Sequence, residues 1–175
     1  MAIRNRASRE LARAADLLIV GRPSTRDICR SLDPGTAVLK GGRPILAVPA
    51  GVDVLKAERI LIGWKDTREA RRALQDSLPL LHEAKSVSIV AVFDNDTETL
   101  NRRSIDDIVQ YLARHRILAS GITTAADELI CIAQAEGADL IVTGAYGHSR
   151  LGEWIFGSVT RDLLTSSPIC CLMAN

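Results

Sequence analysis

Short apolar runs and longer amphipathic stretches alternate along most of the chain. The apolar runs predict buried strands, and apolar residues at helical spacing between them predict helices. The runs cover residues 17–20, 45–48, 59–64, 87–93, 139–144 and 169–173, and the helical patterns cover residues 3–14, 67–81, 104–112 and 126–136. This alternation predicts an α/β fold: an open parallel sheet with right-handed crossovers and helices on both faces.

Polar and turn-forming residues mark the ends of several of these elements. Thr67 is a candidate N-cap for the first long helix, and Pro79 is expected to kink that helix or to end it early. Ser104 and Asp107 form a cap-like pair at the start of the second long helix. Gly137 is expected to stop the third.

One phrase of the sequence occurs twice. Residues 15–21 read Ala-Asp-Leu-Leu-Ile-Val-Gly and residues 138–144 read Ala-Asp-Leu-Ile-Val-Thr-Gly, a displacement of 139 − 16 = 123 positions. After each copy come a glycine with a hydroxyl residue, at 35–36 and 157–158, and then a strand led by proline. Five features in the same order favour an internal duplication over chance similarity between two apolar strands.

The duplication divides the chain into two parts. Residues 1–50 are interpreted as the back half of one repeat and residues 57–175 as a complete second repeat, with a turn-forming linker at 49–53. The apolar strands of an incomplete repeat need cover. We therefore expect residues 45–48 to pair with residues 169–172, either inside one chain or between two.

The second copy of the repeated strand leads into a glycine-rich loop. Gly144 and Gly147 are followed, after nine residues, by Gly157 and Ser158. Glycine amides can approach an anion without a Cβ in the way, and Ser158 can cap the helix that follows. The end of a buried parallel strand is also where open α/β sheets bind their ligands. The pattern predicts a phosphate site in the second repeat, whereas the first repeat has no counterpart of Gly147.

The spacing Gly-x2-Gly-x9-Gly-Ser, with Val159-Thr160 after it and the closing run 168–173, resembles the universal stress protein family in its ATP-binding branch. The resemblance covers nearly the whole chain, which looks like a tandem member whose first repeat lacks its front half. It implies a Rossmann-like adenine nucleotide-binding fold, with five parallel strands in the order 3-2-1-4-5 preceded by the partial repeat. Only residues 117–121 remain for the third strand, which we expect to be short or missing at the sheet edge.

The family resemblance also implies a set of nucleotide-binding residues. It places the base and ribose beside the end of the first strand of the complete repeat, the adenine against its second strand, and the phosphates in the glycine loop. The corresponding residues here are Asp66, Val92, Thr143, Gly144, Gly147, Arg150, Gly157, Ser158, Val159 and Thr160. Of these, Val92 is the expected wall against the adenine, and Arg150 offers a forked guanidinium to a phosphate.

One position departs from the family pattern. ATP-binding members usually carry an aspartate directly after the first strand, but Lys65 occupies that position here and the acid follows as Asp66. A lysine cannot accept hydrogen bonds from ribose hydroxyls, although it can contact phosphate. Asp66 can take over the role only if the turn rotates. ATP binding and a purely structural glycine loop therefore both remain open.

Composition narrows the function classes further. A formal net charge of +1 and an aromatic content of 3% give no sign of a nucleic-acid-binding surface. The chain has no apolar run of membrane-spanning length and no apolar core of a secretion signal near Met1, so we expect a cytoplasmic protein. Four cysteines without C-x-x-C spacing and three scattered histidines predict no metal site.

These observations favour an ATP- or adenine nucleotide-binding regulatory protein of the stress response. ATP is the expected cofactor, with or without Mg²⁺, and the expected partner is a second copy bound through the last strand of a repeat. The alternatives are an assembly and dimerisation module without nucleotide, and a slow ATPase that phosphorylates itself on Ser149, Ser158 or Thr160. No general base or metal-binding carboxylate is placed for hydrolysis, so no catalytic residue is assigned.

Overall fold

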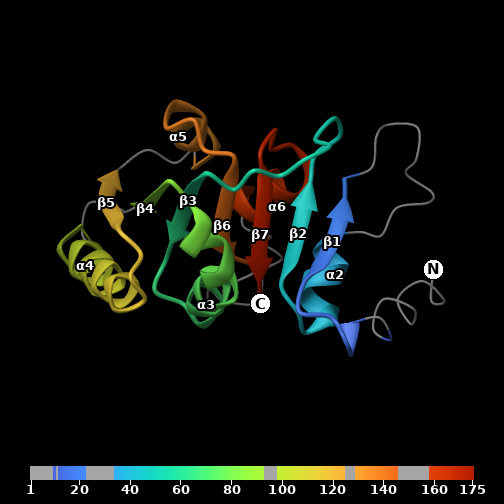
Figure 1. Cartoon of the computed structure of the whole chain (residues 1–175), viewed down its shortest axis with the longest axis horizontal. Coiled ribbons are helices and arrows are strands. Elements are labelled where there is room, and N and C mark those ends of the chain that lie inside the picture. Colours follow the sequence, from blue (N-terminus) through green and yellow to red (C-terminus); the bar gives the residue numbers. More distant parts are fainter. Residues whose placement is uncertain (1–9, 11, 23–33, 93–97, 125–128, 146–157) are drawn as a thin grey trace.

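The computed structural model describes residue 10 and residues 12–22, 34–92, 98–124, 129–145 and 158–175. Helices and strands alternate along the chain, as the apolar pattern predicts (Figure 1). Their bounds are β1 Leu18–Gly21, α2 Pro34–Gly41, β2 Ile45–Val48, β3 Arg59–Trp64, α3 Arg68–Glu83, β4 Ser86–Val92, α4 Glu98–Arg114, β5 Ala119–Thr124, α5 Leu129–Ala135, β6 Leu140–Gly144, α6 Ser158–Thr165 and β7 Cys170–Ala174. Most of the helix expected over 3–14 lies outside the described residues.

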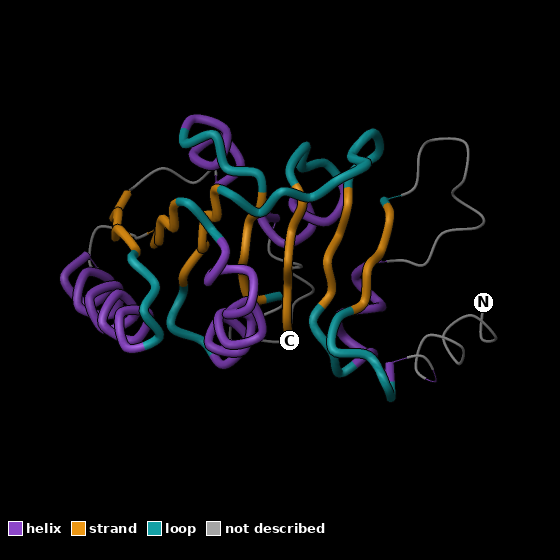
Figure 2. The backbone as a smooth tube through the Cα atoms, viewed as in Figure 1, coloured by secondary structure: helices purple, strands orange, loops and turns teal. Residues whose placement is uncertain are grey.

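All described strands belong to one sheet, which forms a continuous central layer in Figure 2. Its order is β1-β2-β7-β6-β3-β4-β5, so the expectation of five strands is wrong: the sheet has seven. The order across the whole sheet also differs from the predicted one, because β2 pairs with β7 and β1 with β2, which extends the sheet beyond the five expected strands. The five strands from β3 to β7 keep the expected order among themselves. Neighbouring strands are parallel except β2 and β7, which are antiparallel.

The antiparallel contact joins the N-terminal part of the chain to the rest. In its register, Ile45 lies opposite Met173, Leu46 opposite Leu172 and Ala47 opposite Cys171. All six residues are buried. Of the two pairings that the sequence left open, the structure forms the one inside a single chain. The pairing gives the backbone groups at one edge of β2 and one edge of β7 hydrogen-bond partners that neither the N-terminal part nor the rest of the chain supplies alone.

Arg22, directly after β1, adds a polar link between the same two parts. Its guanidinium donates hydrogen bonds to the backbone carbonyls of Ser167 and Ile169, with 3.0 Å between Nη2 and the Ile169 oxygen. A third contact runs from Nη2 to the sulfur of Cys171 at 3.4 Å. Burial raises the pKa of the Cys171 thiol, and the nearby Arg22 charge only partly opposes it. Cys171 is therefore a packed, protonated thiol beside the β2–β7 contact.

The third strand predicted within residues 57–175 is longer than expected. β5 runs from Ala119 to Thr124 and pairs with β4 along its whole length. The prediction of a short or missing strand is wrong because the β-branched residues 122–124 extend it. Gly121 allows α4 to lie directly on this strand, since a Cβ there would be 2.3 Å from Cγ2 of Ile105.

The helix ends follow the predicted signals in part. The Thr67 hydroxyl accepts a hydrogen bond from the Ala70 amide at 3.2 Å and caps α3, as expected. Pro79 does not end α3, which continues to Glu83 because its apolar side is buried against the sheet. α4 begins at Glu98, well before Ser104, so the predicted cap pair is wrong. Gly137 follows α5 with φ of 63°, which fits its expected role as a stop.

Two apolar cores lie on opposite faces of the sheet. One joins β3 side chains such as Ile60 and Ile62 to residues of α3 and α4. The other joins Leu61 and Ile141 to residues of α2, α5 and α6. Residues alternate between the two cores along each central strand, as expected for a sheet buried on both faces. In the described part of the chain, no helix has the length and apolar character needed to cross a membrane.

Candidate functional site

The site that the glycine pattern predicts lies where β3 and β6 end side by side. The two strands are parallel, and their last paired residues are Gly63 and Thr143. After β3 the chain passes to α3 on one face of the sheet, whereas β6 is followed in the chain by α6 on the opposite face. Neighbouring parallel strands followed by helices on opposite faces form a topological switch point, where open α/β sheets hold ligands at the carboxyl edge.

The first turn of α3 sits directly on the end of β6. A Cβ built on Gly144 would lie 2.5 Å from the backbone nitrogen of Ala70 and 2.8 Å from the carbonyl carbon of Glu69. No real side chain tolerates such distances, so glycine is required there for packing alone. The sequence assigned Gly144 to phosphate binding. The close approach of α3 gives it a second and sufficient reason to be glycine.

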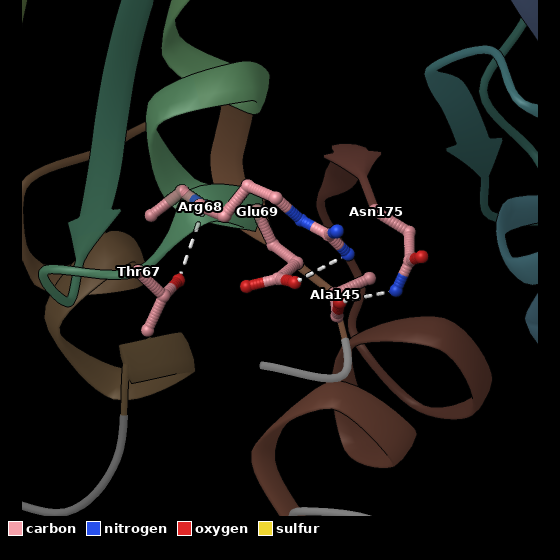
Figure 3. A network of polar contacts seen from close by, with 6 residues as sticks. Thr67, Arg68, Glu69, Ala145 and Asn175 are labelled. Carbon is pink, nitrogen blue, oxygen red and sulfur yellow. Dashed lines mark hydrogen bonds and ion pairs between the residues drawn. The ribbon is translucent and has the colours of Figure 1, made fainter. Parts of the chain in front are cut away.

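Hydrogen bonds hold the end of β6 against both of its neighbouring strands. The Thr143 hydroxyl donates to the carbonyl oxygen of Gly63 at 3.0 Å. Ala145, just after β6, donates its amide to the Ala174 carbonyl at 2.8 Å, and its own carbonyl accepts from Nδ2 of Asn175 at 3.1 Å (Figure 3). The edge of the candidate site is therefore held by β3 on one side and by the end of β7 on the other.

A buried carboxylate occupies the start of α3. The Glu69 side chain is only 4% exposed and pairs with the Arg68 guanidinium at 3.0 Å. Figure 3 shows this pair on the side of α3 that faces Ala145 and Asn175. Burial acts to raise the pKa of Glu69, but its own backbone amide, the Arg68 charge and hydrogen bond, and the Thr67 hydroxyl together hold the pKa below its usual value. Glu69 is thus a fixed negative charge beside β6.

This charge has a consequence for anion binding. The amides at the start of α3 already face Glu69 and the Thr67 hydroxyl, so that helix end is satisfied by the protein itself. Sequence reasoning missed Glu69, although an acidic residue in the first turn of a capped helix is a usable signal.

The turn between β3 and α3 carries the two residues at which the family pattern is broken. Lys65 and Asp66 are both exposed, and the Thr67 amide donates to the Lys65 carbonyl at 2.7 Å. The Asp66 carboxylate forms an ion pair with Arg71 on the solvent side of α3. Asp66 therefore lies at the predicted edge of the sheet with its charge already paired.

Trp64, the last residue of β3, fixes this edge from the α4 side. Its ring is buried, and Nε1 donates to the Ser104 hydroxyl at 2.7 Å. The sequence predicts Trp64 only as a strand residue and Ser104 only as part of a cap. A buried indole usually needs an acceptor, but the sequence does not say which hydroxyl supplies it.

The structure brings part of the predicted nucleotide set together. Asp66, Thr143 and Gly144 lie at adjoining strand ends, and Val92 ends the neighbouring strand β4, opposite Thr124. Ser158, Val159 and Thr160 form the first turn of α6. Gly147, Arg150 and Gly157 lie outside the described residues. In the described part of the chain, no group of histidines, cysteines and carboxylates is arranged to hold a metal ion.

Comparisons with known proteins agree with this architecture. The sequence model described as the Universal stress protein family matches residues 56–175. A solved universal stress protein from Archaeoglobus fulgidus DSM 4304 is similar in fold, with a TM-score of 0.73 at 14% identity over 98% of this chain. A putative universal stress protein from Pseudomonas aeruginosa UCBPP-PA14 gives a TM-score of 0.62 at 15% identity over 94% of this chain.

The matched structures differ in length from this chain. It spans 64% of the Archaeoglobus chain and 65% of the Pseudomonas chain. A universal stress protein solved in complex with cAMP matches 67% of this chain and is itself covered to 96%, with a TM-score of 0.51 at 19% identity. None of the curated proteins matches the chain.

Proposed function

This chain belongs to the universal stress protein family, and on that premise we propose that it is an adenine nucleotide-binding regulatory protein of the stress response. The observation that carries the proposal is the switch point between β3 and β6, with its two helices leaving on opposite faces. A family member of similar fold was solved with cAMP, which supports an adenine nucleotide as the ligand class. ATP is the proposed ligand, with or without Mg²⁺.

Different residues at this edge are proposed to contact the adenine, the ribose and the phosphates of such a ligand. Val92, at the end of β4, is proposed as the wall beside the adenine. The phosphates are directed to the start of α6, where the first helical amides have no partner within the helix. Lys65 is exposed directly after β3 and forms no ion pair within the described part of the chain, so its ammonium is available to a phosphate. Asp66, paired with Arg71, has a smaller part in ribose binding than the family pattern implies.

The direct test is nucleotide content and affinity. Mass spectrometry of the denatured, freshly purified protein should release adenine nucleotide, and calorimetry of the stripped protein should show saturable ATP binding. Lys65→Ala should weaken ATP binding more than AMP binding. Lys40→Ala, an exposed lysine at the end of α2, is the matched control and should change neither.

Replacement of Gly147 and Gly157 by valine should abolish nucleotide binding. A protein that carries no nucleotide and gives no heat with ATP, ADP, AMP or cAMP would refute the proposal. Phosphate release from ATP is measured in the same samples. If the Gly147→Val, Gly157→Val double variant still releases phosphate from ATP, the activity comes from a contaminating enzyme and not from slow hydrolysis by this chain.

An assembly role is the second candidate, and the β2–β7 contact favours it. We propose that residues 1–50 are a partial repeat, because β1-α2-β2 and β6-α6-β7 are matching units joined by antiparallel last strands. Both edges of β2 and of β7 are paired inside the chain. The expected homodimer through a last strand would therefore require two copies to exchange their N-terminal parts. Light scattering tests this, and a stable monomer at micromolar concentration would exclude it.

A further inference from the structure

The two repeated strands, β1 and β6, have different surroundings. Each is followed by a helix and a parallel strand, and the two units meet at β2 and β7. On its other side β6 pairs with β3, and the helix after β3 covers one face of β6. Among the described strands, β1 is the end of the sheet and pairs only with β2 (Figure 1). Matched positions therefore show what β1 is suited to bind.

The first matched pair is Asp139 and Asp16. The Asp139 carboxylate accepts hydrogen bonds from the backbone amides of Glu58 and Arg59, at 2.9 and 3.0 Å, and so anchors the start of β3 beside β6. Asp16 occupies the same place before β1 and is exposed. It makes no such contact within the described part of the chain.

The second matched pair is Val142 and Ile19. Val142 is fully buried, in the core that α3 covers, whereas the Ile19 residue is 71% exposed. On the opposite face the two strands are alike, because Val20 is buried in the core that includes α2. The difference is confined to the face on which α3 lies.

The third matched pair is Gly144 and Gly21. A Cβ on Gly144 would collide with the first turn of α3, but a Cβ on Gly21 would meet no atom within 4 Å. The backbone of Gly21 is not in the left-handed region, so its conformation does not require glycine either. Nothing in the described chain uses the space above Gly21.

The backbone of β1 is also prepared for a further strand. The amides of Leu18 and Arg22 donate to the carbonyls of Pro44 and Val48 in and beside β2, at 3.0 and 2.8 Å. Because alternate residues of a parallel strand turn to the same neighbour, Ile19 and Gly21 turn their amide and carbonyl groups to the outer edge. Such an edge accepts an added strand through backbone hydrogen bonds.

We propose that the outer edge of β1 and the face carrying Ile19 form a docking site for a strand–helix segment of another polypeptide. The segment would lie parallel to β1, place its first amides on Asp16, cover Ile19 with the apolar side of its helix, and bring the start of that helix over Gly21. Its chemistry is that of β3–α3 of this chain: an apolar strand, a capped turn and an amphipathic helix. The partner is a polypeptide other than this chain that carries the front half of such a repeat unpaired, because β3 of this chain is already paired with β6. This inference does not depend on nucleotide binding.

The experiment uses the whole 175-residue chain and a synthetic peptide with the sequence of residues 57–84, which contain β3 and α3. Backbone hydrogen exchange is followed residue by residue. The amides of Ile19 and Gly21 should exchange quickly in the free chain and slow on the order of tenfold or more at saturating peptide, while those of Leu18 and Val20 change little. A peptide with the same residues in scrambled order should have no effect.

Two variants make the test specific. Gly21→Val should abolish the protection but leave the thermal unfolding of the free chain unchanged, because its side chain meets open space until a helix docks. Ile19→Asp should weaken the protection, and Leu118→Asp, at another exposed apolar residue, is the matched control that should not. No protection by the peptide, protection that survives in Gly21→Val, or protection that arises from the chain alone at high concentration would each overturn the proposal. The last result would identify a second copy as the occupant.

Discussion

Replacing Gly144 with alanine should destabilise the protein, whereas the same change at Gly21 should not. The two glycines hold the same place in the repeated strands β6 and β1, and neither has a left-handed backbone. Alanine therefore reduces the entropy of the unfolded chain equally at both positions, which favours folding by about 0.4–1 kcal/mol. Any difference between the variants comes from what the added methyl group meets in the folded state.

At Gly144 the methyl carbon would lie 2.5 Å from the Ala70 nitrogen, a backbone atom in the first turn of α3. Backbone cannot swing aside as a flexible side chain can, so α3 must move as a unit or β6 must shift. Overpacking of this kind costs about 1–3 kcal/mol. At Gly21 the methyl group meets open space, so only the entropy effect remains and Gly21→Ala should stabilise the protein by about 0.4–1 kcal/mol.

Urea unfolding of the apo protein measures both values, with thermal unfolding as a second readout. One kcal/mol corresponds to a shift of about 2–4 °C in Tm for a chain of this size. Equal stability of the two variants would show that the start of α3 does not lie on the end of β6. The geometry of the candidate site rests on that contact, so the result would also remove the basis of the switch point.

Three further predictions concern other polar contacts in the structure. Asp139→Asn should lower the free energy of unfolding by about 0.5–1.5 kcal/mol, because a charged acceptor of two backbone amides becomes a neutral one. Asp16→Asn should have no effect in the same denaturant unfolding. The folded protein holds the pKa of Glu69 below its unfolded value, so the ionised carboxylate stabilises the fold above the unfolded pKa, and this contribution is lost as the pH falls through the folded pKa. The difference in unfolding free energy between wild type and Glu69→Gln should therefore shrink in acid. Denaturant unfolding at several pH values measures this difference. Trp64→Phe should cost about 0.5–1.5 kcal/mol through loss of the bond to Ser104, and adding Ser104→Ala to that variant should cost less than Ser104→Ala does alone.

Much of the fold could be predicted from the sequence because its signals are local. Apolar runs mark the strands, and the Thr67 cap and the Gly137 stop are set by their own backbone neighbours. The pairing of β2 with β7 could be predicted because the duplication left the apolar strand at residues 45–48 without cover from its own incomplete repeat. These features could be predicted from local sequence patterns and from the internal duplication, without information on other contacts between distant residues.

The errors come from contacts that the sequence does not display. β5 continues through residues that are polar but β-branched, and its length depends on pairing with β4 rather than on its own apolar content. α4 begins among polar residues at Glu98, which leaves Ser104 free to accept from Trp64. Gly144 shows the limit most clearly, since an anion and an approaching helix both require the absence of a Cβ.

The two copies of the repeated strand differ in the loop that follows, and this difference limits the number of nucleotide sites. A strand docked beside β1 would recreate the neighbour that β3 provides to β6, and with it a second switch point. The position that corresponds to Gly147, however, is 147 − 123 = 24, which is Ser24, so the first loop lacks that glycine. A docked partner should complete the sheet without completing an anion site. Calorimetric titration with ATP should therefore give the same stoichiometry, one nucleotide per chain, with and without the strand–helix peptide. A second equivalent bound in its presence would show that the glycine loop is not what holds the phosphates.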